Sequence, residues 1–236
     1  MTTRRAWTVL LVAMVAFACV APPSEPLGVP PALEVNDRGL PEVAADSVER
    51  RAQEVTVRVR SLGCDQFGLG SGFVLPGGIV VTNRHVVGQP REVTLNTWDG
   101  RSLSAEVTGV ATDSDLALLQ LADDADMPVA ELRDGPLRSG EEVFAVGYPG
   151  GGPARVSPGR VLGMIDGTVL GEPAEVIRVE VDIAQGNSGG PLVDREGLVV
   201  GVVFAIEVDA GIGLAVPVAT LLERLENGEL VAPGAC

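Results

Sequence analysis

The feature that most constrains the fold of this chain is a series of short apolar runs, each followed by residues typical of turns. The first run, VTVRVR at residues 55–60, alternates strictly between apolar and polar side chains, as in a strand with one buried face. Similar runs follow at residues 72–75, 79–82, 93–95, 104–107, 115–121, 142–147, 156–165, 176–181, 198–206 and 213–216. Many short strands divided by Gly and Pro predict an all-β protein built of antiparallel barrels or sandwiches. Late in the chain, only residues 218–225 have a helical pattern.

The charge excludes several kinds of partner. The formal net charge is −15, whereas sites for nucleic acid or anionic lipid need clustered Lys and Arg. The chain has a single His and 3 Cys, which argues against a structural zinc site. We therefore expect no nucleic-acid partner, no metal and no cofactor.

The N-terminus has the pattern of an export segment. Arg4 and Arg5 precede an apolar run over residues 6–21, which is shorter than the ~20 residues that span a bilayer. This pattern predicts a signal peptide or short membrane anchor over residues 1–21, and hence a periplasmic or cell-surface protein. An A-x-A site at residues 16–18 would leave Cys19 first, where a cysteine suggests lipid attachment. Ala16 and Phe17 depart from the usual lipoprotein pattern, so lipidation, simple cleavage and an uncleaved anchor all stay open.

The remainder divides into a linker and two β units. Residues 22–50 are rich in Pro and lack periodicity, as in an extended linker. A composition break at residues 122–128 suggests a first barrel over 51–125 and a second, with a short C-terminal helix, over 126–236. Cys64 and Cys236 lie near the two ends of the folded part, and in an oxidising compartment they can pair. The alternative is two unrelated thiols, one of them on a frayed tail.

Candidate chemistry centres on Ser188, within DIAQGNSGGPL at residues 182–192. The surrounding glycines suit a turn that presents a reactive oxygen beside bare N–H groups, but also an ordinary hairpin turn. A serine hydroxyl needs a base beside it, and the only histidine is His85, at the end of an apolar strand. Asp115 directly precedes another apolar strand and could orient the imidazole. Asp113 is its rival, although we expect it to be solvated.

The order of these residues along the chain separates two classes of hydrolase. GNSGG at residues 186–190 also matches G-x-S-x-G, the nucleophile elbow of α/β-hydrolases. That class needs a histidine after the serine, and this chain has none. The order His85, Asp115, Ser188 is instead that of the chymotrypsin type.

The motifs TNRHVV, DLALL and GNSGGPL, together with GSGFVL at residues 70–75, resemble those of trypsin-like serine proteases. The bacterial HtrA-type proteases and the MarP-type periplasmic proteases are the most similar, the latter through GYPGGGP at 147–153 and PGRV at 158–161. The resemblance covers residues 55–225. It implies two six-stranded antiparallel barrels, with His85 and Asp115 on the first, Ser188 on the second and the site in the cleft between them.

The resemblance also implies a mechanism through an acyl-enzyme. His85 would take the hydroxyl proton of Ser188 and deliver it to the leaving amine, while Asp115 would fix the imidazole tautomer. The backbone N–H groups of Gly186, Asn187 and Ser188 would form the oxyanion hole.

Three departures from the family patterns set further expectations. Asn187 stands where digestive trypsins have an Asp that pairs with a new N-terminus, so activation through that ion pair is not expected. Because the sequence continues only about ten residues past the helix, we expect no PDZ domain after it. The chain also lacks a multi-helix membrane segment of the kind that MarP-type proteins have.

Substrate preference has two interpretations. Asp182, six residues before Ser188, would floor the primary pocket and attract Arg or Lys, or it would end its strand and point to water or a neighbouring Arg. In the second case a pocket walled by apolar residues would favour small aliphatic side chains. The expected pocket walls are Val203, Phe204, Ala205, Gly213 and Leu214. Other functions on the same fold are a binding module without activity and an esterase, and the oligomeric state is not predicted.

Overall fold

The computed structural model of the chain describes residues 47–64, 66–122, 126–167, 175–207, 211–228 and 230–234. The predicted export segment, Cys19, nearly all of the predicted linker and Cys236 lie outside these residues. No helix within the described ranges has the length and apolar character needed to cross a membrane.

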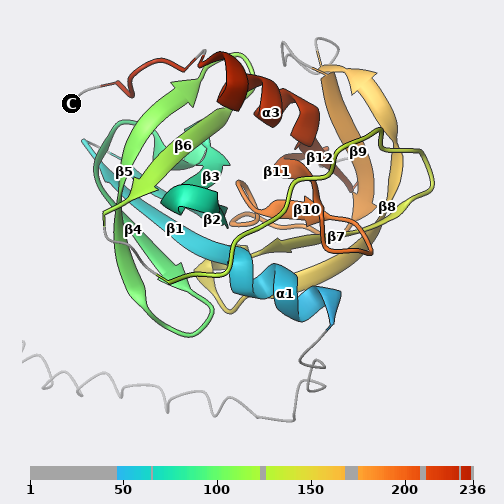
Figure 1. The fold of residues 1–236 in the computed structure, drawn as a ribbon, viewed down its shortest axis with the longest axis horizontal. Helices are drawn as coiled ribbons and strands as arrows, with labels where there is room; N and C mark the ends of the chain where they lie inside the picture. The colour runs from blue at the N-terminus through green and yellow to red at the C-terminus, as the bar shows by residue number, and fades with distance from the viewer. Residues whose placement is uncertain are drawn as a thin grey trace, which may run out of the picture. The chain divides into compact units, whose positions relative to one another are not determined.

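The first barrel closes in the strand order β1-β2-β3-β6-β5-β4, with every pairing antiparallel (Figure 1). Its strands are β1 (Thr56–Gly63), β2 (Phe67–Leu75), β3 (Ile79–Asn83), β4 (Pro90–Thr97), β5 (Ser102–Ala111) and β6 (Leu116–Leu121). Alternate side chains point inward, so that Val57, Val59, Val80, Leu95 and Leu119 are fully buried. The period-two pattern of residues 55–60 is therefore a barrel pattern with one face in the core.

The second barrel closes in the order β10-β11-β12-β9-β8-β7, again with antiparallel pairing. Its strands are β7 (Glu142–Gly147), β8 (Arg155–Asp166), β9 (Glu175–Val181), β10 (Pro191–Val193), β11 (Val199–Glu207) and β12 (Ile212–Pro217). The predicted pair of six-stranded barrels with a C-terminal helix is confirmed. The sequence pattern missed β10, because a strand of 3 residues is too short to display a period.

The helical segments are α1 (Val48–Val55), α2 (Arg84–Val87), α3 (Val218–Asn227) and two short 3₁₀ turns, η1 (Pro76–Gly78) and η2 (Pro149–Gly151). Helix α1 was not predicted: the strand expected from Val55 begins at Thr56, because Val55 ends this helix. Ser47 caps α1 by accepting the Arg50 N–H at 3.1 Å, and such a cap typically contributes about 1 kcal/mol. Helix α3 packs on β11 and β12 of the second barrel.

The C-terminal segment returns to the first barrel. Val231 exchanges both backbone hydrogen bonds with Val110 of β5, at 2.9 and 3.0 Å. The boundary predicted for the second barrel, residues 126–236, therefore includes a segment that pairs with the first barrel. Gly234 then lies against Gln89. Cys64 is disulfide-bonded, but its predicted partner Cys236 lies outside the described residues, so that pairing stays a prediction.

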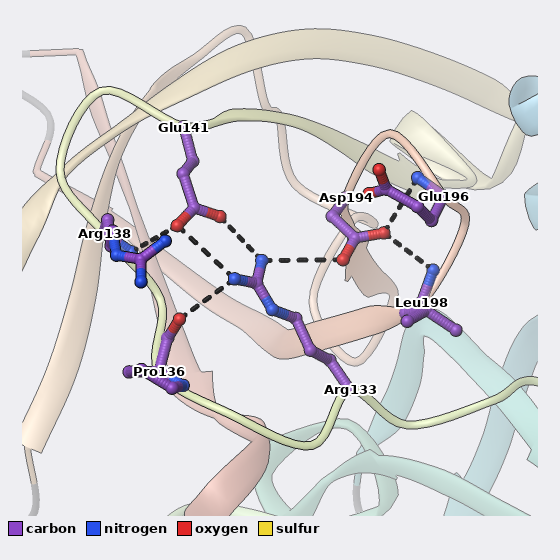
Figure 2. Close-up of polar contacts among 7 residues, drawn as sticks. All are labelled: Arg133, Pro136, Arg138, Glu141, Asp194, Glu196 and Leu198. Atoms are coloured by element: carbon purple, nitrogen blue, oxygen red, sulfur yellow. Dashed lines mark hydrogen bonds and ion pairs between the residues drawn. The ribbon is translucent and has the colours of Figure 1, made fainter.

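An ion-pair network fastens the connection between the barrels (Figure 2). Arg133 donates to the Glu141 carboxylate at 2.6 Å and to the Pro136 carbonyl at 2.9 Å, and lies 3.5 Å from Asp194. Beside this guanidinium the pKa of Glu141 lies below its usual range, while that of Arg133 is raised. Arg133 also donates its backbone N–H to Val199 of β11 at 3.0 Å. A single parallel bridge between Leu132 and Val199 thus holds the connection against the second barrel.

Candidate active site

The ends of two neighbouring strands bring His85 and Asp115 together. In the first barrel, Asn83 at the end of β3 pairs with Leu116 at the start of β6. His85 Nδ1 lies 2.5 Å from Asp115 Oδ2, and the backbone N–H of His85 donates to Asp115 Oδ1 at 3.0 Å. Both carboxylate oxygens are therefore directed at one residue. The pairing of β3 with β6 therefore brings the imidazole of His85 next to the carboxylate of Asp115.

Two further bonds fix the backbone of Asp115. Its carbonyl accepts the Arg84 N–H at 2.9 Å and the Asn83 side-chain amide at 3.0 Å. Asp115 has a φ of +50°, a conformation that Asp tolerates better than most residues. Its side chain is 12% exposed, whereas the rival Asp113 is 52% exposed and pairs with Arg224 at 2.7 Å. The structure therefore favours Asp115 over Asp113, as the sequence did.

The carboxylate determines how the imidazole can act. Facing Asp115, Nδ1 of a neutral His85 must carry the proton, since an ionised carboxylate only accepts. This leaves the Nε2 lone pair free to take a proton from a nucleophile. The His85 side chain is 47% exposed, so the imidazole edge that would do so is open to solvent.

Ser188 lies on a glycine-rich loop between β9 and β10 that packs directly against the first barrel. Gly189 has a φ of +86°, and a Cβ there would lie 2.1 Å from the Ser71 carbonyl and 2.3 Å from the Thr82 hydroxyl. Gly186 has a φ of +103°, with its Cβ position 2.4 Å from the Tyr148 carbonyl. Both positions need glycine for conformation and for space. Because Thr82 belongs to the strand that leads to His85, the loop carries Ser188 to the His85 side of the first barrel.

The Ser188 hydroxyl donates to the Phe204 carbonyl at 3.3 Å. Among the contacts of the described residues, no hydrogen bond joins Ser188 to His85. Nucleophile–base bonds are often long in free enzymes and tighten when substrate binds.

The backbone N–H groups of the loop differ in their availability. The Asn187 N–H donates to the Ala184 carbonyl at 3.0 Å, so this group is not free for the oxyanion hole that it was predicted to join. Within the described part of the chain, the N–H groups of Gly186 and Ser188 have no acceptor. Two unpaired donors on either side of a buried asparagine are what a binding site for a developing oxyanion requires.

Asp182 does not reach a pocket. Its side chain is 79% exposed and lies 3.6 Å from the Arg155 guanidinium, itself 63% exposed. Several predicted wall residues instead surround a small apolar recess inside the core of the second barrel, which is too small to admit a water molecule. It is lined by Val179, Val181, Ile183, Leu192, Val203, Gly213, Leu214 and Ala215.

Of the predicted walls, Val203, Gly213 and Leu214 line this recess. Phe204 and Ala205 do not, because Phe204 is buried in an apolar cluster shared by the two barrels and Ala205 packs against it. The space above Gly213 is already filled, since a Cβ there would lie 2.8 Å from Val181 and 3.1 Å from Ile183.

Two residues that contact the Ser188 loop were not predicted from the sequence. Ser71 of β2 and Tyr148 after β7 are both buried and both contact the Ser188 loop, Tyr148 through its carbonyl at Gly186. Burial raises the pKa of Tyr148 to about 12, so the phenol stays neutral and donates to the Thr56 carbonyl at 3.3 Å. The only sequence indication was their presence in GSGFVL and GYPGGGP, where neither residue had been given a role.

A hollow of about 580 Å³ opens beside His85 on the first barrel. Phe67, Arg84 and Gln89 line it, together with Val231 of the returning C-terminal segment. Phe67 and Val231 are 63% and 55% exposed. This hollow adjoins the imidazole, so a chain that binds across His85 would pass over these side chains.

Comparison with known proteins agrees with the fold and with this arrangement. Residues 70–202 match the trypsin-like peptidase domain, and the chain therefore belongs to the family of trypsin-like peptidases. The resemblance inferred from the motifs is confirmed.

Individual relatives narrow the class further. Serine protease Rv3671c of Mycobacterium tuberculosis (strain ATCC 25618 / H37Rv) is 32% identical over 209 residues, covering 83% of this chain and 52% of that protein. The mitochondrial serine protease HTRA2 of Bos taurus is 36% identical over 216 residues, covering 86% of this chain and 46% of that protein. The chain thus spans about half the length of these curated relatives.

Solved structures agree. The crystal structure of the active form of the Rv3671c protease from M. tuberculosis superposes with a TM-score of 0.70 at 31% identity, covering 80% of this chain and 88% of that one. The HtrA-type protease AlgW with tripeptide gives a TM-score of 0.71 at 27% identity, covering 76% of this chain and 61% of that one.

Proposed function

We propose that this chain is a serine endopeptidase that hydrolyses peptide bonds through His85, Asp115 and Ser188. The observation that carries the proposal is the 2.5 Å contact between His85 Nδ1 and Asp115 Oδ2, next to a serine loop with two unpaired N–H groups. Family membership supports the reaction class.

The chemistry follows from the positions of the groups. Ser188 Oγ attacks the scissile carbonyl while His85 Nε2 takes its proton. The carbonyl oxygen, now an oxyanion, is stabilised by the N–H groups of Gly186 and Ser188, and one such donor typically contributes about 3–4 kcal/mol to lowering the barrier. His85 then protonates the leaving amine, and water hydrolyses the acyl-enzyme by the same route. Asp115 stabilises the imidazolium in both steps.

The preferred substrate carries a small aliphatic residue on the acyl side of the scissile bond. The predicted pocket walls Val203 and Leu214 are apolar and offer no charge to a cationic side chain. A buried cationic side chain needs a carboxylate close by, and the carboxylate of Asp182 is turned to solvent. A preference for Arg or Lys, the other interpretation of Asp182, lacks this support.

Export supports the same assignment. The N-terminal pattern predicts a periplasmic or cell-surface location, with the chain lipid-anchored through Cys19, released by cleavage or held by an uncleaved short anchor. A bond between Cys64 and Cys236 is consistent with an oxidising compartment and with the approach of Gly234 to Gln89.

The test is labelling by a fluorophosphonate probe, which reacts only with an activated serine. We expect covalent modification at Ser188, complete loss in Ser188→Ala and in His85→Ala, and hydrolysis of a denatured polypeptide that follows the same pattern. A folded wild-type protein that is not labelled contradicts the proposal and points to a binding module. Cleavage of activated esters but of no polypeptide points to an esterase.

A further inference from the structure

The Ser188 loop is held by strands of both barrels, since Gly189 and Gly190 bond to Val203 of β11 and Ser188 accepts the N–H of Ser71 on β2. We propose that Ser71, on the first barrel, is a positioning residue that fixes the oxyanion hole of the second barrel. This inference rests on the proposed function.

All polar groups of Ser71 are used, and three of its four hydrogen bonds go to the second barrel. The hydroxyl donates to the Gly186 carbonyl at 2.7 Å and accepts the Tyr148 N–H at 2.9 Å. The backbone N–H donates to the Ser188 carbonyl at 2.8 Å, and the carbonyl accepts the Thr82 hydroxyl at 2.7 Å. Ser71 is 0% exposed, so it does not meet substrate and acts only through the loop.

A trans peptide group points its carbonyl and N–H in opposite directions, so the carbonyl bonds of the loop set its N–H directions. Ser71 fixes the Gly186–Asn187 peptide group, which lies between the two peptide groups that carry the free N–H groups. Four consecutive carbonyls are each bound: Gln185 by Gly150 at 2.7 Å, Gly186 by the Ser71 hydroxyl, Asn187 by Gly190 at 2.9 Å and Ser188 by the Ser71 N–H. With the carbonyls of Gln185 and Asn187 bound, the N–H groups of Gly186 and Ser188 point away from those partners.

Ser71 supplies the only side-chain group among these four donors, and it acts at the weakest point. Gly186 has a φ of +103°, and glycine populates both signs of φ with similar ease. The Gly186–Asn187 peptide group is held at both ends, by the bond of the Asn187 N–H to Ala184 and by the Ser71 hydroxyl at its carbonyl, so loss of the hydroxyl leaves it a single anchor. In a fully buried position no solvent molecule is at hand to replace the hydroxyl. An oxyanion hole stabilises the transition state only when its donors are preorganised.

The same hydroxyl also secures the neighbouring turn. Its bond from the Tyr148 N–H fixes the start of the segment that continues into Gly150, whose N–H binds the Gln185 carbonyl. Gly147, Gly189 and Gly190 pack around Ser71, with Cβ positions 2.8, 2.1 and 3.2 Å from its Oγ, carbonyl oxygen and Cβ. The glycines on the second barrel thus allow a short side chain from the first to reach the loop.

The experiment compares Ser71→Ala with Thr56→Val. Thr56 is also a fully buried residue of the first barrel whose hydroxyl donates to one carbonyl, that of Ala52, at 2.6 Å. Both variants lose a buried hydroxyl, but Thr56→Val leaves the Ser188 loop untouched. We measure melting temperature, kcat and KM on a peptide substrate, the rate of fluorophosphonate labelling, and inhibition by a peptide aldehyde whose adduct oxygen occupies the oxyanion hole.

In Ser71→Ala we expect kcat and the labelling rate to fall about 10- to 100-fold, somewhat less than for loss of a whole donor. Aldehyde affinity should fall by the same factor, while KM changes less than about twofold because the substrate pocket is intact. Thr56→Val should lower the melting temperature comparably and keep rates near wild type. If Ser71→Ala does not fold, Ser71→Cys carries the test, since a thiol of similar size is a weak donor and should cause the same selective loss.

Wild-type labelling rate and aldehyde affinity in folded Ser71→Ala would overturn the inference, and so would equal losses in Thr56→Val. These results differ from failure of the proposed function, in which the wild-type protein itself is unreactive and the inference about Ser71 fails with it.

Discussion

The two barrels hold their chemical groups in different ways. In the first, His85 and Asp115 follow and precede paired strands, and every bond that orients them is made within that barrel. In the second, Ser188 lies on a loop whose carbonyls are held partly by the first barrel. The acid–base pair is thus a product of one barrel, whereas the nucleophile loop takes its shape from the association of both.

An apolar cluster provides that association. Phe73 and Leu116 of the first barrel and Val202 and Phe204 of the second belong to one buried cluster, together with Leu221 of α3. Burying a side chain of this kind typically contributes about 1.5–3 kcal/mol. The hydrophobic contact keeps the barrels together, and the hydrogen bonds of the loop then set its geometry.

The largest loss of kcat is expected from breaking the contact between His85 and Asp115 in the first barrel. Asp115→Asn should lower kcat about 10⁴-fold, because an amide favours the wrong imidazole tautomer. The matched control is Asp113→Asn, whose carboxylate is exposed and bound to Arg224, and there kcat should stay within about twofold. Steady-state kinetics on a peptide substrate measures both. Equal losses in the two variants would mean that Asp115 has no special role.

A smaller loss is expected from deforming the loop on the second barrel. Gly186→Ala puts a Cβ 2.4 Å from the Tyr148 carbonyl at a φ of +103°, so the loop must move and the oxyanion hole is lost. We expect kcat to fall about 10²- to 10³-fold. Gly100→Ala is the control, since Gly100 has a φ of +88° with open space around its Cβ position and should affect stability alone. Unchanged kcat in Gly186→Ala would argue against the loop geometry.

Changing Arg133 in the connection between the barrels should lower the stability of the fold. Arg133→Ala removes the bonds to Glu141 and Pro136 and the contact with Asp194, and should lower the free energy of unfolding by about 2 kcal/mol. Chemical denaturation measures this loss. Arg195→Ala, which removes an exposed pair with Glu142, should leave the melting temperature nearly unchanged.

The ion pair between Arg133 and Glu141 also predicts how the stability of the fold depends on pH. Because Arg133 lowers the pKa of Glu141 in the folded protein, this pair stabilises the fold at pH above the carboxyl's unfolded value of about 4.3. The stabilisation is lost as pH falls through the lower folded pKa. In Arg133→Ala that part of the acid dependence should disappear. An identical acid dependence in the variant and the wild type would show that the pair is not responsible.

The smallest effect is expected at Asp182. Since its carboxylate is exposed and lies near Arg155, Asp182→Ala should change kcat/KM for small aliphatic substrates less than about twofold, because exposed ion pairs contribute little. Profiling a peptide library on both proteins measures this. If the wild type cleaves after Arg and Asp182→Ala does not, the interpretation of Asp182 as the floor of a pocket for basic side chains is correct.

Individual residues show which parts of the fold and site could be predicted from the sequence. The period-two runs predicted strands because a barrel wall has one buried face, as Val57 and Val59 illustrate. Helix α1 was missed because apolar alternation continues from Val55 into β1, while the cap on Ser47 and the Arg50–Glu54 pair that favour helix are local features. Asp182 was ambiguous because its direction depends on a partner from another strand.

By itself, the sequence determined an all-β chain of short strands and the order His85, Asp115, Ser188, because alternation and a single available histidine can be recognised along one chain. The two barrels were implied by the resemblance of its motifs to trypsin-like proteases. Only the tertiary structure decided which N–H groups stay free, where Asp182 points and what Ser71 holds. These outcomes depend on hydrogen-bond partners that the fold supplies from remote segments: Ser71 and Gly186 lie 115 residues apart. Local periodicity carries no information about such pairings.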